Sequence, residues 1–72
     1  MPYPTNEDLP QALRRSLPPH AQDIYREAFN HAWREYASDA ARQEEAAHRV
    51  AWAAVKKRYR KRDGSWTAIP TS

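Results

Sequence analysis

The stretch from Pro19 to Tyr36, PHAQDIYREAFNHAWREY, decides the fold of this 72-residue chain. When it is turned by about 100° per residue, its apolar side chains fall within one arc of about 180° and its charged side chains occupy the other side. The apolar arc consists of Ala21, Ile24, Tyr25, Ala28, Phe29, Ala32, Trp33 and Tyr36. The sequence therefore predicts an amphipathic helix over residues 19–36.

A shorter helix is predicted before this stretch, over residues 9–17. Asp8 can cap it, and Pro10 suits its first turn, where a missing N–H has little effect. Its apolar stripe consists of Leu9, Leu13 and Leu17. Residues 1–7 contain two prolines and are expected to be extended, because proline disfavours the α region in the residue before it.

A third helix is predicted over residues 39–62, with Ser38 or Asp39 as its cap. Gly64 follows it and is the residue type best suited to a left-handed helix stop. The predicted apolar face consists of Ala47, Val50, Ala51, Trp52, Ala54, Val55 and Tyr59. Like the aromatic residues of the second helix, Trp52 is expected to pack in the core.

The tail over residues 63–72 alternates polar and apolar residues from Ser65 to Ile69, which favours a short strand. We expect this strand to lie beside the extended segment around Tyr3, in a two-stranded sheet that joins the N- and C-terminal segments. The predicted fold class is therefore mainly α, a small three-helix domain over residues 1–72 with that short sheet.

Composition excludes several classes of protein. The chain has no cysteine, so it has neither a disulfide framework nor a thiolate metal site. No apolar run reaches the roughly 18 to 20 residues of a membrane span, and the opening Met1-Pro2-Tyr3-Pro4 is unlike a signal peptide. On these grounds, and with a mean hydropathy of −1.07, we expect a soluble, cytoplasmic protein.

The residues that carry chemistry are few. There is no Gly-rich phosphate loop and no Gly-x-Ser-x-Gly elbow, so we expect no enzyme and no cofactor. His20, His31 and His48 do not share the spacing of three or four residues that brings metal ligands together on a helix, so we expect no metal site. His48 falls in the apolar arc of the third helix and is expected to be buried or half-buried, bonded to a carbonyl or a tyrosine hydroxyl.

Charge is distributed unevenly along the chain. Residues 1–36 carry a net charge of −1 and residues 37–72 a net charge of +4. A basic pole favours anionic partners such as nucleic acid, phospholipid or an acidic protein face. The basic run over residues 56–62 is either the solvated end of a helix, where the helix dipole favours cations, or a contact surface. The candidate partner- and anion-binding residues are Lys56, Lys57, Arg60, Lys61 and Arg62.

Two blocks of the sequence resemble the ChaB family. After the opening Met1-Pro2-Tyr3, the first block contains Asp8-Leu9-Pro10 and then Leu17-Pro18-x-His20-Ala21-Gln22-Asp23-Ile24-Tyr25-x-Glu27-Ala28-Phe29-Asn30-x-Ala32-Trp33. The second is Glu44-Glu45-x-Ala47-His48-x-Val50-Ala51-Trp52-x-Ala54-Val55-Lys56-x-x-Tyr59, followed by Trp66. The resemblance implies a small cytoplasmic protein of three helices and a small sheet, with a cyclin-box-like topology and no known catalytic site.

The resemblance also implies a function. The family takes its name from a proposed regulation of a sodium/calcium–proton antiporter, which implies a non-enzymatic regulatory or adaptor protein that acts by protein–protein contact on this membrane partner. The sequence differs from the family pattern in two places. The segment over residues 37–43 is shorter than the family's linker, and Arg42 replaces the serine that often precedes the Glu-Glu pair.

An alternative function comes from the basic residues. Some bacterial relatives carry an extra module of a type associated with nucleic-acid binding, and the run after Tyr59 is more basic than the family pattern. The alternative is a nucleic-acid-binding accessory protein that uses the basic C-terminal end of the third helix.

Overall fold

The computed structural model describes residues 2–70 of the chain. In chain order its elements are η1 (Asn6–Asp8), α1 (Gln11–Ser16), α2 (Pro19–Glu35), α3 (Ala40–Arg58), β1 (Tyr59–Arg62) and β2 (Ser65–Ala68). Within residues 2–70 the fold is thus mainly α, with three α-helices and a short two-stranded antiparallel sheet, as the sequence predicts. Met1 of the predicted extended segment and residues 71–72 of the predicted tail lie outside the described residues.

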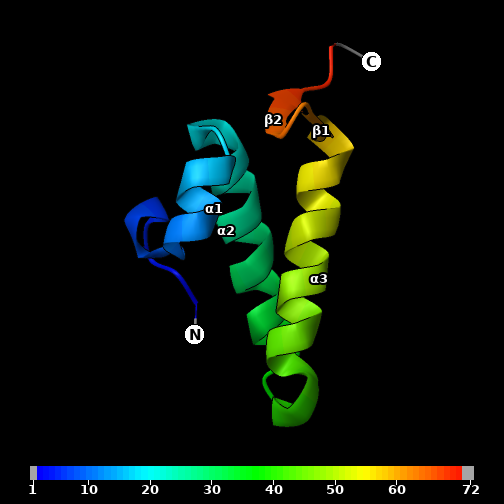
Figure 1. Cartoon of the computed structure of the whole chain (residues 1–72). Coiled ribbons are helices and arrows are strands. Elements are labelled where there is room, and N and C mark those ends of the chain that lie inside the picture. The colour runs from blue at the N-terminus through cyan, green and yellow to red at the C-terminus, as the bar shows by residue number, and fades with distance from the viewer. Residues whose placement is uncertain (1, 71–72) are drawn as a thin grey trace.

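The core lies along the seam between α2 and α3, which run antiparallel and side by side (Figure 1). Alanines let the two helices approach closely, and aromatic rings fill the space around them. The buried residues of this seam are Ala21, Tyr25, Phe29 and Ala32 from α2, and Ala46, Ala47, Ala51 and Val55 from α3. Leu9 and Leu17, on either side of α1, join the same core. Tyr36 and Val50, although predicted on the apolar arcs, remain exposed.

The region before α1 differs from the predicted extended segment over residues 1–7 and helix over residues 9–17. The short helix η1 forms because the Asp8 carboxylate accepts hydrogen bonds from the Thr5 backbone N–H (3.0 Å) and the Thr5 hydroxyl (2.9 Å). Asp8 therefore completes the capping box of η1, whose N-cap is Thr5, and does not cap α1, which begins only at Gln11. The local side-chain bond to Thr5 has replaced the predicted cap.

The N-terminal segment packs against α2 and takes no part in the sheet. The Asn30 side chain accepts a hydrogen bond from the Tyr3 N–H (2.7 Å) and donates one to the Tyr3 carbonyl (2.9 Å). The Tyr3 ring lies 4.9 Å from the Phe29 ring. One side-chain amide thus satisfies both backbone groups that a neighbouring strand would bond. The predicted pairing of this segment with the tail is therefore wrong.

The sheet is instead a hairpin that directly follows α3. This helix ends at Arg58, before the predicted end at residue 62, and Tyr59 already has an extended backbone (φ −133°, ψ 155°). Asp63 and Gly64 have φ of 51° and 82°, and positive φ at both central residues is the requirement of a type I′ hairpin turn. The Asp-Gly pair, predicted to stop a helix, turns β1 back onto β2.

Candidate partner- and anion-binding surface

The basic run is divided between the end of a helix and a strand. Lys56 and Lys57 lie on the last turn of α3, whereas Arg60, Lys61 and Arg62 lie on β1. All five side chains are exposed, and we call them together the basic surface. The predicted continuous helical end does not form, because the backbone becomes extended directly after α3.

The strand sorts its basic residues onto two sides of the hairpin, because successive side chains of a strand point in opposite directions. Arg60 and Arg62 share one side. Lys61 shares the other with Tyr59 and with its cross-strand partner Trp66. Since Tyr59 is 7% exposed and Trp66 is half-buried, this second side faces the helices. The two guanidinium groups therefore lie on the outer side of the hairpin.

No carboxylate pairs with the basic surface within residues 2–70. The two contacts of opposite charge in this range are Arg26–Asp23 at 3.8 Å and His31–Glu35 at 3.5 Å, the second being ionic only when the imidazole is protonated. Both lie on α2. The positive charge of the basic surface is consequently screened by solvent and salt alone.

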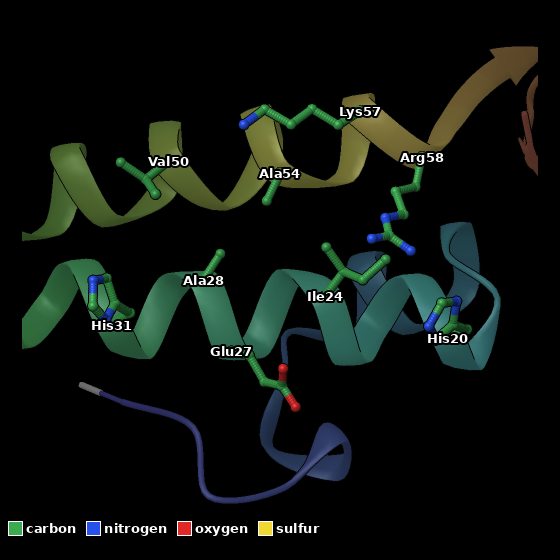
Figure 2. Close-up of a pocket in the computed structure, with 9 residues that line it drawn as sticks. All are labelled: His20, Ile24, Glu27, Ala28, His31, Val50, Ala54, Lys57 and Arg58. Carbon is green, nitrogen blue, oxygen red and sulfur yellow. The ribbon is translucent and has the colours of Figure 1, made fainter. Parts of the chain in front are cut away.

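An open pocket of about 560 Å³ lies between α2 and α3, next to the basic surface (Figure 2). Figure 2 shows Arg58 reaching from α3 toward Ile24 of α2, whereas Lys57 runs along α3 and Glu27 points away from α3. The other lining residues are His20, Ala28, His31, Val50 and Ala54. Arg58 is absent from the predicted contact residues, although it belongs to the same basic run.

A hydrogen bond between Tyr59 and His20 joins the hairpin to the start of α2. The Tyr59 hydroxyl lies 3.1 Å from Nδ1 of His20. Because Tyr59 is buried and is the first residue of β1, this contact attaches the start of the strand to α2. His20 is thus a positioning residue for the basic surface. The sequence separation of 39 positions explains why no sequence spacing reveals this contact.

His48 hydrogen-bonds a tyrosine hydroxyl, which was one of its two predicted partners. Its Nδ1 lies 2.9 Å from the Tyr25 hydroxyl, which donates the bond when the imidazole carries its proton on Nε2. The predicted burial of His48 is wrong, because its side chain is exposed at the edge of the core. Burial of Tyr25 raises the pKa of its hydroxyl from 10.0 to about 12, with a smaller contribution from Tyr3.

Within residues 2–70, no three histidine, aspartate or glutamate side chains are grouped closely enough to hold a metal ion. None of the helices within residues 2–70 has the length and apolar character needed to cross a membrane.

The model of the ChaB family matches residues 9–68, which is most of the chain. This chain belongs to the ChaB family. The matched range extends from just before α1 to the last residue of β2, so it contains the whole basic surface. Tyr3 and η1 precede the range matched by the ChaB model.

Named relatives agree with the ChaB assignment. The protein named "Putative cation transport regulator ChaB" from Escherichia coli K12 is 56% identical over 68 residues, which cover 88% of this chain and 90% of the relative. The protein of the same name from Shigella flexneri has the same identity and coverage. The NMR solution structure of a ChaB regulator matches with a TM-score of 0.83 and 51% identity, covering 94% of this chain and 99% of that one.

Proposed function

We propose that this ChaB protein is a non-enzymatic regulator of cation transport that acts by direct contact with a protein partner. The observation that carries the proposal is its 56% identity to a relative whose name describes a cation transport regulator. The partner class that the family name implies is a sodium/calcium–proton antiporter, contacted from the cytoplasmic side.

The basic surface is the proposed contact. Its five cations are exposed and unpaired within residues 2–70, so they attract an acidic protein face and accelerate its approach. Arg60 and Arg62 lie together on the outer side of the hairpin, where a partner can reach both guanidinium groups without displacing the core. Arginine forms two parallel hydrogen bonds with a carboxylate, which adds geometric specificity to the attraction.

The test measures cation–proton antiport in inverted membrane vesicles from cells that lack the gene. We expect deletion to change antiport and sodium or calcium tolerance, and the unaltered gene to restore both. A variant with glutamine at Lys57, Arg60, Lys61 and Arg62 should fail to restore them. Antiport that is unchanged by the deletion itself would contradict the proposal.

A matched control removes the same charge elsewhere. Arg14, Arg15, Arg34 and Arg49 are exposed, and their side chains have no hydrogen bond or ion pair within residues 2–70. Glutamine at all four lowers the net charge by the same amount as the test variant. If this control fails to restore transport as well, overall charge and not the basic surface is responsible.

A second candidate function is nucleic-acid binding, favoured by the two guanidinium groups on the outer side of the hairpin. If all five cations of the basic surface contact phosphates, log affinity should fall with log salt with a slope of about −4 to −5 on duplex DNA. Fluorescence anisotropy with a labelled duplex between about 50 and 200 mM salt measures this slope. Affinity that ignores both salt and the four glutamine substitutions would exclude this function.

A pull-down from native lysate separates the two candidate functions. The bait is the unaltered chain, and each lysate is divided into halves with and without nuclease. A protein partner that remains after nuclease treatment supports regulation by contact. Proteins that are lost after this treatment were held through nucleic acid, which supports the second function.

A further inference from the structure

A second groove, of about 680 Å³, crosses α2 between α1 and α3. The two flanking helices lie against α2 from different sides (Figure 1), and the N-terminal segment contributes Tyr3. The remaining lining residues are Pro10, Ala12, Leu13, Tyr25, Phe29, Glu44, Glu45, His48 and Trp52. We call it the aromatic groove. None of the five residues of the basic surface lines it.

Aromatic rings in contact with one another form the floor of the aromatic groove. The Tyr25 ring centroid lies 6.0 Å from that of Phe29 in a stacked arrangement and 5.4 Å from that of Trp52 in a T-shaped one. Tyr3 packs on Phe29 at the N-terminal side. Tyr3 and Trp52 are only half-buried, so part of each ring remains open to a ligand. Such ring faces attract both apolar groups and cations.

The charge of the aromatic groove is opposite to that of the whole chain. Glu44 and Glu45 of α3 line it, both are exposed, and neither forms an ion pair within residues 2–70. No lysine or arginine lines the groove, although the chain has a net charge of +3. The Nδ1 atom of His48 is bonded to the Tyr25 hydroxyl. An occupant that matches this groove is therefore apolar on one side and cationic on the other.

We propose that the aromatic groove binds a short basic amphipathic segment of a partner protein. Its apolar side chains lie on Trp52 and the other floor rings, and a neighbouring lysine or arginine reaches Glu44 and Glu45. The volume lies within the range of pockets that hold drug-sized ligands, which suits a few side chains and not a second folded domain. The proposal uses other residues than the basic surface, so it stands or fails independently of the function proposed there.

Two synthetic peptides test the charge complementarity on the full chain. The basic probe is acetyl-Leu-Arg-Phe-Lys-Leu-amide, and the acidic probe carries Glu and Asp in place of Arg and Lys. Binding is followed in ¹H–¹⁵N NMR spectra at low salt, up to about 1 mM peptide, where even weak binding of about −4 kcal/mol is visible. We expect the basic probe to shift the Trp52 indole and the amides of Leu13 and Glu45, while the acidic probe leaves them in place.

Charge-removing variants locate the binding. E44Q/E45Q should weaken the basic probe at least about fivefold, because it removes the ionised groups of the groove and no core contact. The control E7Q/E27Q removes two exposed carboxylates that do not line the groove and should bind as the parent does. Dispersed spectra verify that both variants are folded.

Four outcomes would overturn the proposal. Equal binding of the two probes would show an apolar groove without charge selection, and shifts confined to β1 and β2 would show binding elsewhere. An absence of any shift at about 1 mM basic probe would show that the groove does not take such a segment. Groove resonances that move on dilution of the protein alone would identify a second copy of this chain as the occupant.

Discussion

The α2–α3 seam and the β1–β2 hairpin are held together in different ways. The seam is a continuous row of buried alanines and aromatic rings, so its stability comes from side-chain packing along the helices. The hairpin has a single buried residue, Tyr59, and otherwise depends on its turn and on contacts with distant residues. Trp66 of β2 lies 5.2 Å from Trp52 of α3, and Tyr59 bonds His20. Local periodicity of the sequence specifies the two helices of the seam, whereas the hairpin is supported by contacts with residues of those helices.

The largest effect is expected from Trp52→Ala, because this residue contacts both regions. Its ring lies against Tyr25 in the seam and against Trp66 in the hairpin. We expect a loss of about 3 kcal/mol in the free energy of unfolding, the lower end for such truncations because Trp52 is only half-buried. Urea denaturation followed by circular dichroism measures the loss. A variant that unfolds like the parent would show that Trp52 belongs to neither region.

A somewhat smaller effect follows from the raised pKa of Tyr25 in the seam. The unfolded chain releases this phenol proton near pH 10, and the folded chain only near pH 12. The contribution of Tyr25 to the free energy of unfolding is therefore fully present below pH 10. It is lost as the pH rises to 12, by at most about 2.5 kcal/mol.

Tyr25→Phe isolates that contribution from the other groups that titrate in alkali. The stability of the parent should fall relative to that of the variant between pH 10 and 12, measured by urea denaturation at each pH. Absorbance near 295 nm should show a phenol with a midpoint of about 12 that the variant lacks. Stability curves that run parallel over this range would mean that Tyr25 is not protected by burial.

A third substitution tests the close approach of the helices. Ala51→Leu adds a side chain where α3 is fully buried against α2, and we expect it to cost about 2 kcal/mol through overpacking. Ala53→Leu is the matched control, because Ala53 is an exposed position of the same helix. Thermal unfolding of the two variants compares them. Equal melting temperatures would contradict the tight packing of the seam.

The smallest effect is expected from Gly64→Ala in the hairpin turn. A Cβ at this position would meet no atom within 4 Å, so the expected cost of about 1 kcal/mol comes only from the positive φ of 82°. Amide hydrogen exchange should become faster in β1 and β2 and stay unchanged in the centre of α2. Faster exchange throughout the molecule would show that the hairpin and the seam unfold together.

Much of the fold was predictable from local patterns. The period of the apolar residues predicted α2 to within one residue, and prolines marked the break before it. The hydrogen bond of His48 to a tyrosine hydroxyl was also among the predictions, because a polar residue on an apolar arc needs a hydrogen-bond partner. The end of α3 was not predictable in this way, since Tyr59 continues the apolar face of that helix as well as it begins β1.

The contact residues could be predicted in type but not in arrangement. The basic run was visible as a block of charge, yet its division into helical and strand positions depends on the Asp63-Gly64 turn and on Tyr59 bonding His20. Arg58 was missed because its direction toward α2 follows from where the helix ends (Figure 2). The aromatic groove left no signal, since its lining residues come from four separate parts of the chain.

The sequence by itself determined the helical class, the position of α2, the uneven charge and the family, because each of these depends on residue types or on spacings of three or four positions. Only the tertiary structure decided where α3 ends, which segment pairs with β2, and which side of the hairpin carries Arg60 and Arg62. The physical reason is competition between similar local conformations. A residue such as Tyr59 is compatible with both helix and strand. Its strand conformation is accompanied by contacts with His20 and the seam, which form only when distant segments meet.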